Sequence, residues 1–455
     1  MLKSMLKKQS TSQFTAPQVI TFGFASIILL GAILLSLPIS SKTGEATNFL
    51  DALFTATSAT CVTGLTTLTT AAHWSLFGQI VIITLIEIGG LGFMSLPIIF
   101  YLITRKKVGL GMRIALRQSL NLEGRSGEMN LMVYIIKNAL LIQFVGMLLL
   151  AVDFIPRFGL QKGIWYSFFH AISAFCNAGF DIFGDSLVPF QQNPWVLSVI
   201  SGLIISGGLG FIVWYDILDY KKTHRLSLHS KIALLVTAGL LIFGTLGFML
   251  TEQNGQSLVE GNFIQRFFNT IFMSVTPRTA GFYSVDYFSM THAGLLLTII
   301  LMFIGGTSGS TAGGFKTTTF GILIIKMVSI FKGKERAEYK GRTIKESTVS
   351  RALVLFFLML SLVIVSTMIL SISETVPNVN ELGLEYIVFE VVSALGTVGL
   401  TMGLTPDLSA LGKIIILMLM FIGRVGIMTV VFSLVSRGVS NKQTFKYPDE
   451  TVIIG

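Results

Sequence analysis

Four short polar segments of this chain could bind a cation through backbone oxygens. They read CVTGL, CNAGF, RTAGF and GTVGL, and they are centred on Gly64, Gly179, Gly281 and Gly399. Glycine permits positive φ and close backbone approach, so the carbonyl groups of such a turn can point to one side. Rings of carbonyl oxygens replace the hydration shell of an ion in a selectivity filter. No carboxylate lies inside the four segments, so the pattern predicts a filter made of backbone alone.

The four segments recur roughly once every hundred residues, which indicates an internal repeat. Each segment follows a short apolar stretch and precedes a long one. About a dozen residues make a half-helix that is too short to cross a bilayer, whereas ~20 apolar residues can span it. The sequence therefore predicts an all-α membrane protein with four helix–pore-helix–helix repeats around a single pseudo-fourfold pore. The predicted repeats are 16–105, 131–216, 231–330 and 351–437, between an N-terminal segment, 1–15, and a tail, 438–455.

The second long helix of each repeat carries its own glycine pattern. The four segments are IGGLGF at 88–93, SGGLGF at 206–211, IGGTSG at 304–309 and IGRVGI at 422–427. Glycines three apart on one helix face, such as Gly89 and Gly92, allow helices to pack closely. We expect continuous helices over 75–103, 194–215 and 409–436, and an interrupted helix in the third repeat.

Composition and charge support a multi-pass membrane protein. The chain is 52% hydrophobic and only 12% charged, whereas soluble domains carry roughly 25% charged residues. The net charge of +10 comes largely from alternate loops, such as 104–130 and 326–351. The positive-inside rule therefore places these loops and both termini in the cytoplasm, and explains the charge without a nucleic acid partner. Two cysteines, Cys61 and Cys176, make no disulfide framework.

A second constellation, GGTSGSTAGGFKTTT, interrupts the third repeat at 305–319. Glycine, serine and threonine at this density do not form a stable helix, and a broken helix inside a membrane points to a binding site or a gate. The alternatives are a cytoplasmic linker and a phosphate-binding loop, but Phe315 separates Gly314 from Lys316 and breaks the phosphate-loop order. The predicted gate residues are Gly305, Gly306, Thr307, Ser308, Gly309, Ser310, Thr311, Gly313, Gly314 and Lys316.

Arg424 stands where the first three repeats have Gly90, Gly208 and Gly306. A charged residue at the centre of a membrane helix costs at least ~2.5 kcal/mol, so it is rarely present without a role. If the repeats superimpose, Arg424 faces the axis opposite the gate segment. There it raises a barrier to a passing cation or donates hydrogen bonds to the carbonyl groups of the loop. The alternative is a structural ion pair with Glu87.

Longer segments around the turns match a known family. They read SAFCNAGF at 173–180, TPRTAGF at 276–282 and GTVGLTMGLTP at 396–406, and FIGR follows at 421–424. The chain resembles the superfamily of bacterial Trk/Ktr and plant HKT potassium transporters, and the Ktr membrane subunit most of all, over nearly its whole length. The resemblance implies K⁺ at a filter whose backbone comes from Thr60, Cys61, Val62, Thr63, Gly64, Asn177, Ala178, Gly179, Thr279, Ala280, Gly281, Thr397, Val398 and Gly399.

The resemblance also implies a function and partners. We expect potassium uptake across the cytoplasmic membrane through a channel-like pore, gated by the loop at 305–314 and by Arg424. The family implies a homodimer, a cytosolic ring of RCK-type nucleotide-binding subunits, contact with membrane lipids, Na⁺ as an activator and no cofactor in this chain. One alternative is a gradient-coupled secondary transporter, such as a Na⁺/K⁺ symporter. Another is a membrane enzyme using Lys316 or His170, although no acid–base pair supports it.

Overall fold

Four copies of one helical unit build the described part of the chain. The computed structural model describes residues 15–92, 128–253, 261–374, 383–435 and 450. Each unit begins with a long apolar helix, and these four helices are long and apolar enough to cross a membrane. They are α2 (Ala16–Ser36), α8 (Glu128–Phe158), α12 (Leu228–Thr251) and α16 (Glu346–Ser373). The predicted all-α membrane fold is confirmed, while most of the predicted N-terminal segment and tail lie outside the described residues.

A half-helix follows in each unit and ends at one of the glycine turns. The half-helices are α3 (Phe49–Thr60), α9 (Leu160–Cys176), α13 (Phe263–Val275) and α17 (Leu384–Gly396). The shortest has 12 residues, or about 18 Å, well below the ~30 Å of a hydrocarbon core. Asn48 caps α3, because its side chain accepts a hydrogen bond from Leu50 N at 2.8 Å. The second half of each half-helix is buried, so the turns lie inside the molecule.

The second helix breaks in the later repeats and ends early in the first. The pieces are α5 (Leu76–Leu91), α10 (Pro194–Gly208) with α11 (Phe211–Thr223), α14 (His292–Phe303) with α15 (Thr317–Phe331), and α19 (Ala410–Val425) with α20 (Ile427–Val435). The bends are 95° between α10 and α11 and 98° between α19 and α20. The prediction of continuous helices over 194–215 and 409–436 is therefore wrong, and residues 93–103 lie outside the described part.

One glycine in each pattern explains these breaks. Gly92, Gly210 and Gly426 have φ of 85°, 93° and 93°. A residue with positive φ cannot continue a right-handed helix, and glycine adopts this conformation without a steric penalty. No described atom lies within 4 Å of the position of a Cβ on Gly92. The positive φ of Gly92 ends α5, and the close packing predicted for this residue stays a prediction.

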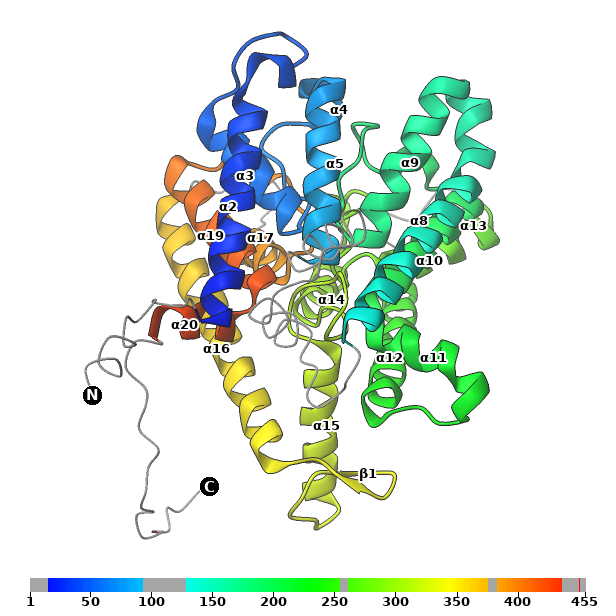
Figure 1. Ribbon diagram of the computed structural model, residues 1–455, viewed down its shortest axis with the longest axis vertical. Helices are drawn as coiled ribbons and strands as arrows, with labels where there is room; N and C mark the ends of the chain where they lie inside the picture. Colours follow the sequence, from blue (N-terminus) through cyan, green and yellow to red (C-terminus); the bar gives the residue numbers. More distant parts are fainter. Residues whose placement is uncertain (1–14, 93–127, 254–260, 375–382, 436–449, 451–455) are drawn as a thin grey trace, which may run out of the picture.

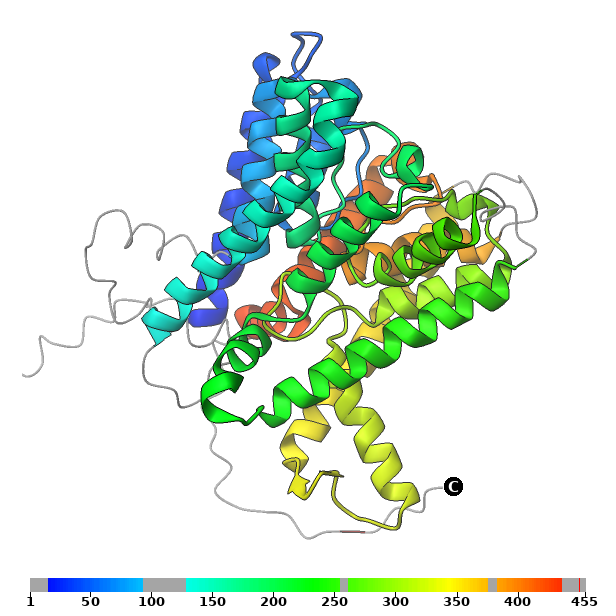
Figure 2. The same cartoon turned by 90° about the vertical axis from the view of Figure 1, so that its right-hand side faces the viewer.

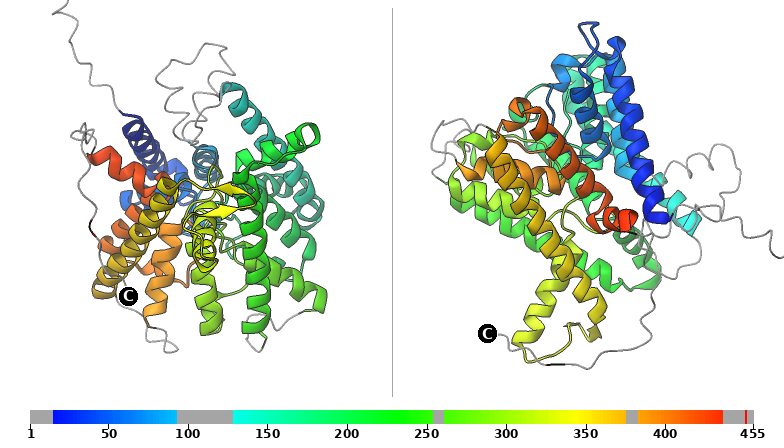
Figure 3. Two further views of the ribbon diagram at one scale, coloured as in Figure 1. Left: turned by 90° about the horizontal axis from the view of Figure 1, so that it is seen from below. Right: turned by 90° about the vertical axis from the view of Figure 1, so that its left-hand side faces the viewer.

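The units follow one another around the molecule. Viewed from below in Figure 3, the colours run around the bundle in chain order. The last unit closes the circle, because α19 packs against α3 and α20 packs against α2. The described residues contain four spans by length and composition, or six if each bent pair counts as one. α5, α14 and α15 are shorter apolar helices.

Short elements complete the fold. They are η1 (Pro38–Ser40), α4 (Thr70–His73), η2 (Val188–Phe190), η4 (Tyr287–Ser289), α18 (Leu404–Asp407), β1 (Glu338–Tyr339) and β2 (Arg342–Thr343). The two strands pair antiparallel, with Glu338 opposite Thr343. Figures 1 and 2 show this hairpin at the tip of an extension formed by α15 and the start of α16.

A polar staple joins the end of the first helix to the start of the second in each unit. Glu374 accepts hydrogen bonds from Ser409 N at 2.8 Å and from Ser409 Oγ at 2.6 Å. Thr291 Oγ1 donates to Glu252 in the third unit, and Asn193 Nδ2 donates to Asp153 in the second. In the first unit, Ser75 Oγ donates to the Ile39 carbonyl at 2.6 Å. These bonds satisfy helix ends and set the spacing of the two long helices above each turn.

We predict that Glu374 makes stability depend on pH. Burial raises the pKa of Glu374, but the hydrogen bonds from Ser409 and Ser373 outweigh it, and the pKa lies below its usual value. A lowered folded-state pKa adds stability above the unfolded pKa of about 4.3 and loses it as the pH falls through the folded value. Glu374→Gln should lower the free energy of unfolding at pH 7 by about 1–3 kcal/mol and flatten its dependence on pH below 5.

Thermal unfolding in detergent, followed by circular dichroism between pH 3 and pH 7, measures this effect. The control is Glu338→Gln, which removes an exposed carboxylate paired with Lys334 on the hairpin. Exposed ion pairs contribute little to the free energy of unfolding. Equal losses of thermal stability in the two variants would contradict a stabilising role for the hydrogen bonds of Glu374.

Candidate functional site

The four glycine turns share one backbone conformation. Each has two residues in the left-handed region, the glycine and the residue two positions earlier. The glycines Gly64, Gly179, Gly281 and Gly399 have φ of 99°, 69°, 77° and 94°, and the earlier residues Val62, Asn177, Thr279 and Thr397 have φ of 56°, 61°, 74° and 50°. Left-handed backbone costs roughly 1–2 kcal/mol for a residue other than glycine. Strain of this kind persists only where surrounding structure imposes it, and it concentrates at functional sites.

The turns meet and form a closed ring. A Cβ atom added to Gly64 would lie 2.5 Å from the Ala178 carbonyl oxygen, and one on Gly281 would lie 2.5 Å from that of Val398. Gly179 faces the Ala280 carbonyl in the same way, and Gly399 faces that of Thr63. Every glycine thus faces the residue before the next glycine, and the fourth turn faces the first. The tertiary structure brings all four predicted filter segments together, so that each turn contacts the next one around the ring.

Hydroxyl residues of the half-helices hold the turns. Ser58 O, Ser173 O and Ser393 O each accept a hydrogen bond at 2.8 Å from the residue before the glycine. Ser58 Oγ and Ser393 Oγ also accept from the glycine N–H, at 3.0 and 3.1 Å. In the third repeat Thr276 takes this role, since its carbonyl accepts from Ala280 N at 2.9 Å and its hydroxyl donates to the Phe282 carbonyl. The predicted site does not include these residues, although a serine stands six positions before the glycine in three repeats.

Glycines of the second helices support the turns from outside. Gly89, Gly207 and Gly423 lie against the carbonyl groups of Thr60, Phe175 and Leu395, respectively. Each of these carbonyls belongs to the fourth residue before a filter glycine. Any side chain at the three glycines would displace the end of a half-helix. The packing role predicted for Gly89 is therefore confirmed.

The predicted gate segment forms a loop between α14 and α15. Thr307 N and Thr311 N donate to the carbonyls of Gly208 and Gly207, at 3.0 and 3.3 Å. The ends of the loop are joined, because Gly305 N donates to Phe315 O at 2.9 Å. A Cβ atom on Gly313 would overlap the Thr397 side chain of the fourth turn. The loop therefore lies against both the broken end of α10 and the ring of turns.

Arg424 links the loop to α5. Its Nη1 donates to the Thr311 carbonyl, and its Nη2 donates to the carbonyls of Gly89 and Gly90, the latter at 3.0 Å. The predicted anchoring of loop carbonyls by Arg424 is confirmed. The alternative ion pair with Glu87 is wrong, because Glu87 accepts hydrogen bonds from Gln143 and Cys176 instead. Both residues lie on helices that face the centre, but rotation about the helix axes separates them.

A cavity of about 470 Å³ adjoins the loop. Gly90, Phe211, Ser308 and Lys316 are among the residues that line it, together with Arg424. Lys316 Nζ donates to Ala312 O at 2.7 Å. No carboxylate lines this cavity within the described residues. Two basic side chains, those of Lys316 and Arg424, therefore lie beside the cavity.

The residues of the enzyme alternative are engaged in structural contacts. His170 Nδ1 lies 2.7 Å from Tyr166 O, and its ring stacks on Phe183 with 4.1 Å between centroids. Lys316 bonds to a backbone carbonyl. The described residues contain no group of three or more His, Cys, Asp or Glu side chains that could hold a metal ion. In the described part of the chain, both side chains of the enzyme alternative are thus engaged in contacts with neighbouring groups.

Comparison with known proteins identifies the family. The profile of the TrkH cation transport proteins matches residues 27–442. The chain belongs to this family. The solved potassium transporter TrkH from Vibrio parahaemolyticus has the same fold, with a TM-score of 0.71 at 16% identity, over 94% of this chain and 86% of that one. The family consists of cation transporters and not of enzymes.

Curated relatives of the chain are similar over its whole length. The potassium/sodium uptake protein NtpJ of Enterococcus hirae is 59% identical, over 99% of this chain and 100% of the relative. The Ktr system potassium uptake protein B of Bacillus subtilis is 40% identical, over 97% of each chain. The resemblance to Ktr-type subunits is therefore confirmed, and the chain is a multi-pass membrane transporter.

We predict that a side chain at Gly399 breaks the ring. The φ of 94° and the Thr63 carbonyl opposite both exclude a Cβ atom. Gly399→Ala should cost about 1–2 kcal/mol for the left-handed backbone alone, and lower both the unfolding midpoint in detergent and the ratio of K⁺ to Na⁺ flux in liposomes. The control is Gly202→Ala, since Gly202 lies within α10 and has open space at the Cβ position. If both substitutions lowered the unfolding midpoint and the flux ratio equally, the assignment of the Gly399 turn to the filter would be wrong.

Proposed function

We propose that this chain is the ion-translocating subunit of a Ktr-type system and carries K⁺ across the cytoplasmic membrane through a gated, channel-like pore. The observation that carries the proposal is the closed ring of four left-handed turns. The printed names of the relatives, potassium/sodium uptake protein and Ktr system potassium uptake protein, support the same ion. All fourteen predicted filter residues belong to the four turns or to the residues leading into them.

The ligand set suits a monovalent cation. Neutral carbonyl oxygens replace water around the ion, and without a carboxylate the ion can also leave. The half-helices end at the turns, so the negative ends of their dipoles favour a cation at the ring. The buried hydroxyl groups of Thr60, Thr63 and Thr397 have no hydrogen-bond partner within the described residues. Buried polar atoms without a partner need an explanation, and an ion or water in the pore supplies one.

The gate is the loop at 305–314 with Lys316 and Arg424. In this arrangement the loop is attached to α10 by the hydrogen bonds of Thr307 and Thr311 and to α5 through Arg424. Opening requires the bond between Arg424 and the Thr311 carbonyl to break and the loop to leave the ring. The positive charges of Lys316 and Arg424 add an electrostatic barrier while the loop remains.

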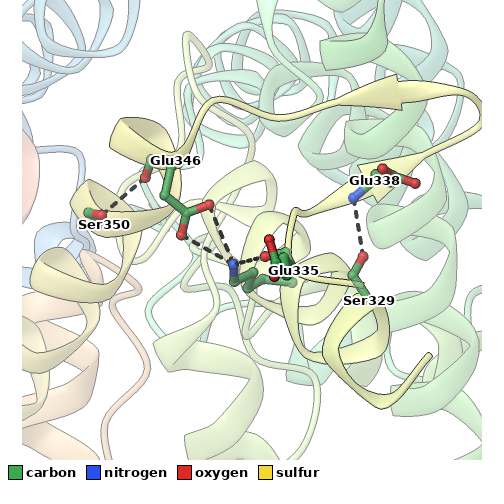
Figure 4. A network of polar contacts seen from close by, with 6 residues as sticks. Ser329, Glu335, Glu338, Glu346 and Ser350 are labelled. Carbon is green, nitrogen blue, oxygen red and sulfur yellow. Dashed lines mark hydrogen bonds and ion pairs between the residues drawn. The ribbon is translucent and has the colours of Figure 1, made fainter. Parts of the chain in front are cut away.

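A cytosolic ring of nucleotide-binding subunits would act on this gate, and the chain would work as a homodimer with both termini in the cytoplasm. The extension of α15, the hairpin and α16 suits this contact because it continues directly from the gate loop. Lys326 Nζ donates to the Glu335 carbonyl, at 2.7 Å, and to Glu346, at 3.2 Å, and these bonds brace the extension. Figure 4 labels the two acceptor residues, Glu335 and Glu346. Phe331, the last residue of α15 in this extension, is 80% exposed.

A gradient-coupled Na⁺/K⁺ transporter is the second candidate. The name of the 59% identical relative includes sodium, and the second helices are broken in more than one repeat, as in secondary transporters. The name of this relative is also compatible with sodium acting as an activator of potassium flux. Flux that persists without any sodium or proton gradient distinguishes a channel from a coupled transporter.

We predict that Arg424→Gln raises potassium flux in the absence of the regulatory ring. The substitution removes the charge and the bond to Thr311, and a hydrogen bond from a charged donor contributes about 1.5–3 kcal/mol, so flux should rise roughly tenfold or more. Purified protein in liposomes, with K⁺ and Na⁺ flux recorded separately, measures it. Arg157→Gln is the control, because Arg157 pairs with Asp153 near the C-terminal end of α8.

Deletion of residues 307–312 extends this test. Potassium flux in this variant and none in the wild type would support the gate. If folded wild type and deletion variant both pass no ion under any gradient, the filter assignment fails.

We predict that Lys326→Ala weakens activation by the ring. The substitution removes the bonds that hold the Glu335 carbonyl and Glu346 together, so a movement at the hairpin no longer reaches α15. The expected result is at least about a threefold loss of ring-stimulated flux, with unchanged flux in the deletion variant. Lys334→Ala is the matched control, since that lysine pairs with Glu338 at 2.6 Å on the surface. The same loss in both variants would argue against transmission through Lys326.

A further inference from the structure

A hydrogen-bonded cluster behind the second filter turn joins three helices. The Glu87 carboxyl group on α5 accepts hydrogen bonds from Gln143 Nε2 on α8, at 2.9 Å, and from the Cys176 thiol at the end of α9, at 3.3 Å. Both bonds reach Oε2, while Oε1 is buried without a hydrogen-bond partner among the described residues. A buried polar atom without a partner is costly. Such local costs are typical of positions retained for function and not for stability.

The cluster lies directly against the filter. Cys176 precedes Asn177, the first left-handed residue of the second turn, and stands three residues before Gly179. Gly90, which follows Glu87 by one helical turn, leaves room for it, because a Cβ atom on Gly90 would lie 2.5 Å from Cys176 Sγ. One face of α5 therefore holds the last residue of α9 by a hydrogen bond and by close contact.

The same end of α5 holds the gate. The carbonyls of Gly89 and Gly90 accept hydrogen bonds from Arg424, which also binds the Thr311 carbonyl. The Thr311 hydroxyl in turn donates to the Phe175 carbonyl, at 3.1 Å, next to Cys176. These contacts form a circuit from α5 to α9, from α9 to the loop, and back to α5. In Figure 1, α5 lies between α3 and α9, and it packs against both.

We propose that Glu87 is a positioning residue for the second filter turn. It holds Cys176 against α5, so the preference for K⁺ over Na⁺ depends on a side chain that touches no ion. Without this bond the end of α9 keeps weaker contacts, among them Gln143 Nε2 to Cys176 Sγ at 3.8 Å, the packing of Gly90 and Gly207, and the bond from the gate loop. The proposal rests on the proposed function of the four turns as a potassium filter.

Flux of K⁺ and Na⁺ into liposomes tests the proposal, with the ratio of the two fluxes as the readout. Glu87→Leu and Cys176→Ala should each lower the ratio about threefold to tenfold. Glu87→Gln keeps an acceptor oxygen and should give an intermediate ratio. The double variant should be no worse than Glu87→Leu alone, because both changes remove one interaction. The matched control is Thr84→Val, since Thr84 is an exposed residue of α5 whose hydroxyl donates to the Ile80 carbonyl of the same helix.

Several outcomes would overturn the proposal. If Glu87→Leu lowers both fluxes in proportion and leaves the ratio unchanged, Glu87 contributes to folding alone. If Glu87→Leu does not fold, the Cys176→Ala variant provides the test, and a flux ratio equal to that of Thr84→Val rejects the proposal. A wild type and gate-deletion variant without any preference for K⁺ would reject the proposed function first, and this inference with it.

Discussion

The constraint on which the rest of the structure depends is the hydrogen bonding of backbone inside a membrane. Irregular backbone at membrane depth is tolerated only where it is buried in protein or faces a watery path. Four turns leave the helical conformation at this depth, each with two left-handed residues. Serine and threonine side chains of the half-helices satisfy part of their polar groups. In the proposed function, the carbonyls of these turns replace water around an ion, so the fold and the proposed transport have one physical origin.

The breaks in the second helices supply the acceptors that the gate uses. The last carbonyls of a helix have no partner within it. Gly92 ends α5 and frees the carbonyls of Gly89 and Gly90, which bind Arg424. Gly210 ends α10 in the same way, and the freed carbonyls of Gly207 and Gly208 bind the loop. The broken ends of α5 and α10 thus provide the acceptors to which the loop of the third repeat is attached, directly or through Arg424.

Filter and gate are therefore neighbours, and they share supports. α5 contacts the first turn through Gly89 and the second through Glu87 and Gly90, and it holds Arg424 at its end. If the loop moved away from Arg424, α5 would lose its link to the loop, and α5 is the helix that positions two of the turns. In the proposed orientation, the extension of α15 and α16, which begins at the loop, would carry a movement from a cytosolic partner to this point.

The sequence by itself determined the features that arise within one segment. Glycine turns, half-helices too short to span, the Asn48 cap and the helix-breaking composition of 305–314 follow from local conformational preferences, so they could be predicted. Gly92, Gly210 and Gly426 could not be assigned, because a glycine in an apolar run is compatible with close packing and with a break alike. Only the tertiary structure decided which groups meet: Arg424 binds Thr311 and not Glu87, and Glu87 binds Cys176. Such partners come from different repeats, and their pairing depends on the rotation and depth of whole helices, which neither hydropathy nor spacing specifies.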